Sequence, residues 1–304
     1  MRVLEIALLV AFFALGLLTQ RGGAAGILRE QSWTAYFWTI TPALVFYAFS
    51  TVEVDRELAL ALAAVVAASW LVLGISYCYA IAVSDERDER GALTLAAAFP
   101  NTGFVGFPLA QIALGNPGLA LMVIYDRLGW LTPATAVSTT IARLYGNREA
   151  EKPGRRRLWL LAANPPLLAA VLAIGFRVGG VEVGGAAEPV GRVAGAVVGP
   201  AGFFLLGLAL PLERPSHDLA ELGRASGVLA IRFVVAPLLL YGIGWAIGAE
   251  IPSAFLLGAA MPSAFHLLIL ARVFDLRPHL MRLLVLGSTV PAVAAVVTAT
   301  AVLR

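Results

Sequence analysis

Apolar runs of about 20 residues recur along the whole chain of 304 residues. A run of this length spans the hydrocarbon core of a bilayer as an α-helix. Hydrophobic residues make up 60% of the sequence and charged residues 13%, whereas soluble domains carry about 25% charged residues. A soluble protein of this length could not bury so much apolar surface, so we predict an all-α polytopic membrane protein.

Ten apolar runs are separated by short polar stretches. We expect membrane spans at residues 4–18, 33–51, 58–83, 91–114, 119–144, 158–178, 189–212, 222–247, 253–274 and 280–303. The polar stretch 145–157 holds the strongest basic cluster, with Arg148, Lys152 and three arginines at 155–157. Basic loops lie on the cytoplasmic side of a membrane. The expected protein is therefore multi-pass in the cell (inner) membrane, with loop 145–157 cytoplasmic and both termini outside.

The basic loop divides the chain into a first five-span repeat, residues 1–144, and a second one, residues 158–304. An odd number of spans in each half makes the second half inverted relative to the first. The fourth span is interrupted at Pro100 and Asn101, and the ninth at Pro262. Proline-interrupted spans at matching positions of two halves indicate a transport site near the bilayer midplane.

The fourth span carries two prolines, two glycines and an asparagine within residues 99–108. A proline inside a helix removes a backbone hydrogen bond, and each freed polar group in hydrocarbon is costly unless protein, water or ligand satisfies it. Asn101 can donate a hydrogen bond to a substrate carboxylate at the break or cap the following half-helix, and Thr102 is a lesser candidate of the same kind. Pro100 and Gly103 shape the break and complete the expected substrate-binding set on this span.

Residues 98–109, with the sequence AFPNTGFVGFPL, closely resemble the fourth-helix signature of the auxin efflux carrier family. The stretch 258–271, GAAMPSAFHLLILA, resembles the second crossover helix of that family, and the pairs Asn164-Pro165 and GLAL at 207–210 also fit. The family includes plant PIN carriers and many bacterial transporters, some linked to malate or malonate. It belongs with the bile-acid, arsenite and riboflavin transporters.

The resemblance implies ten helices in two inverted repeats, with helices four and nine crossing at their breaks. It also implies a carboxylate-bearing substrate at the crossing and an elevator-like movement of one domain against a scaffold of helices one, two, six and seven. The implied partners are a small mono- or dicarboxylate and the lipid bilayer, with a homodimer through the scaffold helices as a further candidate. A cation/proton antiporter and a bile-acid-type sodium symporter are alternatives on the same architecture.

The ninth span departs from the family pattern at His266, since many bacterial members have asparagine four residues after the proline that is Pro262 here. A neutral imidazole can hydrogen-bond a carboxylate, and a charged one can pair with it. A reference pKa of about 6.5 also suits a coupled proton. The structural alternative is a hydrogen bond to a neighbouring helix. Pro262 and His266 are thus expected at the substrate site, with His266 as a candidate for proton coupling.

Three charges lie inside predicted spans: Asp126 and Arg127 in the fifth, and Arg232 in the eighth. Charges at this depth are costly and usually face a cavity or a partner. Asp126 is a candidate for ion or proton coupling, and its alternative is a structural or polar-network role, with Arg232 as one conceivable partner. Arg127 can snorkel to the interface if the span is shifted.

Other function classes find little support in the sequence. The single cysteine, Cys78, excludes an intrachain disulfide and a cysteine-rich metal site. Three histidines, with no acid–histidine motif within the spans, do not suggest an enzyme, and no Walker-type sequence for an ATP-driven pump is present. No cofactor, metal or nucleic acid is indicated. A passive channel is an alternative, although broken inverted halves favour alternating access.

Overall fold

The computed structural model describes residues 2–20, 22, 25–148, 164–209 and 219–302. Regular structure within these residues is helical throughout. A helix satisfies its own backbone polar groups in hydrocarbon, which is why an apolar chain of this kind adopts it. Several predicted features lie outside the described residues, namely most of the basic loop (149–157) and the span ends at 158–163, 210–212 and 303.

The described helices before residue 149 follow one another with short connections, and π-helical segments (labelled η) continue some of them. They are α1 (Arg2–Thr19), α2 (Ala25–Ala35), η1 (Tyr36–Ile40), α3 (Thr41–Thr51), α4 (Arg56–Val83), α5 (Arg87–Ala98), η2 (Thr102–Gly106), α6 (Phe107–Ile124), η3 (Tyr125–Trp130) and α7 (Leu131–Tyr145).

The described helices after residue 163 include one π-helical segment, η4, which joins two α-helices. They are α9 (Pro165–Val178), α10 (Gly184–Ala209), α11 (Leu219–Ala230), η4 (Ile231–Val235), α12 (Ala236–Ile247), α13 (Ser253–Ala259), α14 (Leu267–Phe274) and α15 (Pro278–Val302).

Five helical stretches in the described part of the chain are long and apolar enough to cross a membrane: Arg56–Val83, Thr102–Gly129, Gly184–Ala209, Ala220–Ile247 and Pro278–Ala295. Two shorter apolar helices accompany them, Ile6–Thr19 and Pro165–Val178. These findings confirm a helical, multi-pass membrane protein. The count of ten spans and the inverted relation of the two halves stay predictions.

Local sequence explains where several helices begin and turn. Asp55 caps α4, because its carboxylate accepts a hydrogen bond from the Leu58 amide at 2.8 Å, a favourable arrangement at a helix N-terminus. Asn164 caps α9 ahead of two prolines. Within α6 the chain turns sharply at Gly115, where φ is 73°. A residue with a side chain rarely adopts this φ. This turn lies between the spans expected to end at 114 and begin at 119.

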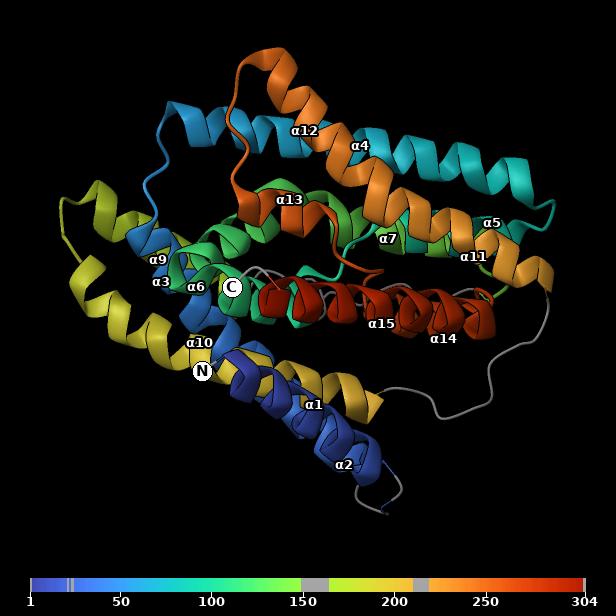
Figure 1. Ribbon diagram of the computed structural model, residues 1–304, viewed down its shortest axis with the longest axis horizontal. Helices are drawn as coiled ribbons and strands as arrows, with labels where there is room; N and C mark the ends of the chain where they lie inside the picture. Colours follow the sequence, from blue (N-terminus) through green and yellow to red (C-terminus); the bar gives the residue numbers. More distant parts are fainter. Residues whose placement is uncertain (1, 21, 23–24, 149–163, 210–218, 303–304) are drawn as a thin grey trace.

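Two groups of helices enclose the broken segments. In Figure 1, α4 and α12 run along one side of the molecule and α1 and α10 along the other, with α5, α13 and α14 between them. Helix α1 packs on α10, and α3 packs on both α9 and α10. The α1–α10 contact depends on glycine, because a Cβ at Gly16 would lie 2.3 Å from the carbonyl oxygen of Phe204. Small residues allow this close approach of helices in membranes.

Candidate functional site

The two proline-containing breaks meet at the centre of the molecule. One separates α5 from η2 at residues 99–101, and the other separates α13 from α14 at residues 260–266. The Asn101 amide donates to the Pro262 carbonyl at 2.7 Å, and the Ala264 amide donates to the Phe99 carbonyl at 2.8 Å. This short antiparallel pairing explains how two broken helices persist in an apolar protein, since each break supplies the hydrogen bonds that the other lacks.

Two serine hydroxyls stabilise this backbone pairing through hydrogen bonds. Ser263 is fully buried, and its Oγ donates to the Ala96 carbonyl at 2.8 Å. Its amide donates to Ser288 Oγ on α15 at 3.0 Å. The second break is thereby tied both to the C-terminal turn of α5 and to α15.

Arg232 is the buried cation of the crossing. It lies in η4, is 2% exposed, and donates hydrogen bonds to four backbone carbonyls. Nη1 reaches Ala97 at 3.1 Å and Ala98 at 2.8 Å, Nη2 reaches Ala259 at 2.5 Å, and Nε reaches Met261 at 3.1 Å. These carbonyls belong to the C-terminal ends of α5 and α13 and to the residues just after α13, where the helix dipoles place partial negative charge.

The pair between Asp126 and Arg232, one alternative for the role of Asp126, is therefore not observed among the described residues. Asp126 lies in η3, where its carboxylate accepts a short hydrogen bond from Thr102 Oγ1 and forms an ion pair with Arg127 Nε at 3.1 Å. Both side chains of this pair are largely buried, at 12% and 13% exposure, so Arg127 does not snorkel away from the site. Backbone carbonyls accept the hydrogen bonds of Arg232 instead, and the Asp126 carboxylate interacts with Thr102 and Arg127.

Asn101 fulfils one of its two expected roles and is free for the other. Its Oδ1 accepts from the Phe104 amide at 3.3 Å, which caps the half-helix formed by η2 and α6. Its Nδ2 is buried and has no hydrogen-bond partner among the described residues. A buried donor without a partner is costly, so this amide is suited to a ligand oxygen.

His266 occupies the corresponding place on the second break, at the N-terminus of α14. Its backbone carbonyl accepts the first amides of that helix, from Ile269 at 3.0 Å and Leu270 at 3.1 Å. Its ring packs edge-on against Phe99, with the centroids 6.4 Å apart. Nε2 is buried without a partner in the described part of the chain, so the expected alternative of a hydrogen bond to a neighbouring helix is not observed.

The residues Asn101, Asp126, Arg127 and His266 line one cavity of about 530 Å³. Five of the six predicted substrate-binding residues line it together with the predicted coupling residue Asp126: Pro100, Asn101, Thr102, Gly103 and His266. Pro262 is not among the lining residues and contributes its carbonyl to the pairing of the breaks.

Sequence reasoning missed the wall opposite the breaks. Tyr36 in η1 donates its hydroxyl to the Gly103 carbonyl at 2.8 Å and stacks on Phe104, with ring centroids 5.0 Å apart. Trp33 stacks on the same ring at 4.8 Å. Nothing separates these residues from ordinary apolar ones in the sequence. The π-helical segments are a structural sign of the site, because π-helical turns are frequent at functional sites. Each of η1, η2, η3 and η4 carries a residue of the cavity or of the crossing beside it.

The arrangement is suited to binding a small anion. Two helix N-terminal ends lie at the cavity, and its lining residues Asn101 and His266 each carry a buried side-chain nitrogen without a partner among the described residues. Helix N-termini favour negative charge, and the Arg127 and Asp126 side chains of the lining pair with each other. Among the described residues, no group of three or more His, Cys, Asp or Glu side chains is placed to hold a metal ion.

Comparisons with known proteins identify the family of this chain. Residues 35–300 match the family described as membrane transport protein. An uncharacterized transporter of Methanothermobacter thermautotrophicus is 30% identical over 219 residues, which cover 71% of this chain and 69% of that protein. An uncharacterized transporter of Methanocaldococcus jannaschii is 29% identical over 203 residues, covering 62% and 61% of the two chains. The chain therefore belongs to the membrane transport protein family, the family of the auxin efflux carriers.

Proposed function

We propose that this transporter moves a small organic anion, a mono- or dicarboxylate, by alternating access at the crossing of its two broken helices. One observation carries the proposal: Asn101 Nδ2 and His266 Nε2 are both buried without a partner in the described part of the chain, and both residues line the same cavity. A carboxylate has two oxygens that accept hydrogen bonds. It could therefore accept one hydrogen bond from each break.

The charges of the cavity support an anion over a cation. Asp126 is already engaged by Thr102 and by Arg127, so its negative charge is offset next to the substrate position. A cation/proton antiporter is the second candidate, since Asp126 is a carboxylate at the cavity wall. That candidate requires Asp126 to release Arg127 when it binds a cation, whereas anion binding leaves the pair intact.

The position of Arg232 argues against sodium coupling at the back of the crossing. Carbonyls at the C-terminal ends of broken helices are typical sodium ligands in transporters. Here the Arg232 guanidinium donates to those carbonyls, so a fixed positive charge occupies the place of an ion. The remaining expectations accompany this proposal: inverted halves, cytoplasmic loop 145–157, outside termini, location in the cell membrane, and elevator-like movement. His266 is the candidate for proton coupling.

The direct test is transport by the purified protein in proteoliposomes. Labelled acetate, malonate, succinate and malate are supplied under a sodium gradient, a proton gradient or a membrane potential alone. We expect uptake of at least one carboxylate. Uptake of sodium or potassium in exchange for protons, with no carboxylate moving under any gradient, would replace the proposal by the antiporter.

Asn101→Asp tests the site within the same assay. The variant keeps the Oδ1 cap but replaces the unpartnered donor by a second acceptor, so the fold should persist while the anion is repelled. Loss of one hydrogen bond to a charged group costs about 2 kcal/mol, so with the added repulsion kcat/KM should fall by at least about 30-fold. Asn116→Asp is the matched control, because Asn116 also uses Oδ1 as an acceptor, from Gln111 at 2.8 Å, and lies outside the cavity. Equal transport by both variants would remove Asn101 from the site.

A further inference from the structure

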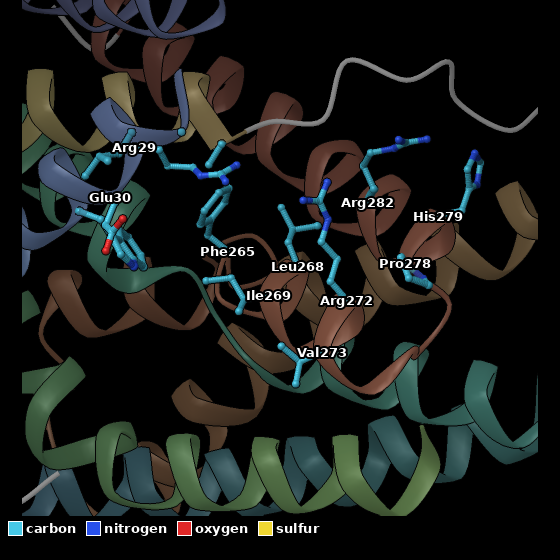
Figure 2. A pocket seen from close by; sticks show the side chains of 14 residues that line it. Arg29, Glu30, Phe265, Leu268, Ile269, Arg272, Val273, Pro278, His279 and Arg282 are labelled. Carbon is cyan, nitrogen blue, oxygen red and sulfur yellow. The ribbon is translucent and has the colours of Figure 1, made fainter. Parts of the chain in front are cut away.

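A second cavity of about 540 Å³ adjoins the first. It lies between α2, α10, α14 and α15, and Figure 2 shows its labelled side chains. Arg29, Glu30 and Phe265 are at one end, His279 is at the other, and Arg272 lies between them. The cavity is thus built from α2, from the C-terminal part of α10 and from the consecutive helices α14 and α15, with polar side chains along its length.

The charges of this cavity are mainly positive. Arg29, Arg272 and Arg282 line it, and Glu30 is the acidic side chain in its lining. Arg282 is only 4% exposed, whereas Arg29 and Arg272 are exposed. Within the described part of the chain, neither Arg29 nor Arg272 forms an ion pair with a carboxylate. Charge of one sign in a cavity with low-dielectric walls attracts counter-ions strongly.

An aromatic partition separates the two cavities. Trp33 and Phe265 line both of them. Their rings are 6.4 Å apart in an edge-on arrangement, and each packs against Phe104, at 4.8 Å for Trp33 and 5.9 Å for Phe265. Phe104 belongs to η2, directly after Asn101. The partition is therefore built on both broken helices and on α2, and a movement of the breaks relative to α2 would separate its rings.

We propose that the second cavity is an anion-collecting vestibule for the transported carboxylate, and that Trp33, Phe104 and Phe265 form the gate between the vestibule and the central site. This inference rests on the proposed function. The occupant is a soluble carboxylate, because the cavity shares Trp33 and Phe265 with the substrate site and one of its lining cations, Arg282, is buried. A lipid phosphate has the same hydrogen-bonding chemistry, and the experiment distinguishes the two sources.

The test of the vestibule does not require the substrate. In a Cys78→Ser background, Ile269→Cys places a thiol at the cavity wall. Its reaction rates with an anionic and a cationic methanethiosulfonate of similar size are compared. The positive potential should favour the anionic reagent, and Arg272→Gln should lower the anionic-to-cationic ratio by on the order of five-fold at low salt. A thiol introduced by Val54→Cys, in the exposed loop before α4, is the control and should not respond to Arg272→Gln.

The outcomes separate the two proposals. A ratio near that of the Val54→Cys control, or one unchanged by both Arg272→Gln and Arg29→Gln, would overturn the vestibule even if carboxylates are transported. If the ratio falls as expected but no carboxylate moves, the cavity attracts anions and the proposed function fails. Protection of the thiol in phosphatidylglycerol nanodiscs, but not in phosphatidylcholine nanodiscs, would assign the cavity to a lipid headgroup and overturn the pathway.

Transport kinetics and the rate of thiol labelling in the central cavity test the vestibule and the gate further. For any carboxylate that is transported, Arg272→Gln should raise KM several-fold at low salt with kcat retained, and the difference should vanish at high salt. Phe265→Ala should speed the anionic labelling of a thiol introduced by Thr102→Cys. Trp33→Ala is the second variant in case the first does not fold. Unchanged labelling in both gate variants would show that the rings do not close the passage.

Discussion

Replacing Arg232 by methionine should loosen the crossing of the broken helices. The side chain has a similar length and no donors, so the carbonyls of Ala97, Ala98, Ala259 and Met261 all lose the partner that they have in the structure. These groups are the ends of two helices in a protein interior, where water does not readily replace a donor. The perturbation therefore acts where η4 is bonded to the ends of both α5 and α13.

The magnitude follows from the four bonds. Each buried carbonyl left without a donor costs about 1–3 kcal/mol, and the desolvation of the guanidinium, which is recovered on its removal, favours the low end of that range. Four carbonyls then give about 4 kcal/mol, or about three powers of ten in the ratio of folded to unfolded protein. Arg232→Lys keeps the charge but replaces a three-nitrogen fork by one nitrogen, so we expect an intermediate loss.

Thermal denaturation in detergent, followed by the monodisperse fraction on size exclusion, measures these losses. Arg177→Met is the matched control. Arg177 also donates to carbonyls at a helix end, reaching Val52 at 2.5 Å and Phe49 at 3.4 Å, but its side chain is 41% exposed. Water can replace that arginine, so the control should lose less than about 1 kcal/mol. Equal melting of Arg232→Met and the wild type would refute the role assigned to Arg232.

Two further predictions concern the cavity and the paired breaks. Asp126→Asn removes the counter-charge of Arg127, so the KM of a transported anion should fall. Arg127→Gln leaves the charge of Asp126 without its counter-charge and should raise that KM. Initial rates in proteoliposomes measure both values of KM, and shifts in the same direction would contradict the charge argument. Ser263→Ala deprives the buried Ala96 carbonyl of its donor and should cost about 1–2 kcal/mol in thermal denaturation, while the exposed Ser226, which bonds a carbonyl at 2.7 Å, should tolerate alanine within about 0.5 kcal/mol. Similar losses in the two serine variants would show that burial is not the cause.

The breaks could be predicted because proline and asparagine inside an apolar run conflict with a continuous membrane helix. That conflict is local, so one sequence suffices to place Pro100, Asn101 and Pro262, and the structure brings all three together. His266 could be placed for the same reason, since a polar residue just after a break lies at the N-terminus of the next half-helix.

The partners of buried charges could not be predicted in the same way. An acid is the obvious partner for Arg232, and Asp126 was the acid at a suitable depth. Backbone carbonyls have no sequence signature, so the sequence alone could not identify the carbonyls that accept the hydrogen bonds of Arg232. The aromatic gate was missed for a related reason: Trp33 and Phe265 have the composition of any membrane helix, and only their packing in three dimensions distinguishes them.

The contacts of Arg232 also restrict which parts can move during transport. Its four hydrogen bonds join η4, and with it α11 and α12, to both breaks. Separating them would expose several buried carbonyls at once, so the broken helices and the α11–α12 helix should move as one body. Among the described residues, the contacts across the cavity are weaker, namely the hydrogen bond from Tyr36 to Gly103 and the rings stacked on Phe104. For the proposed alternating access, the sliding surface should therefore lie between η1 and the breaks, beside the rings of the proposed gate.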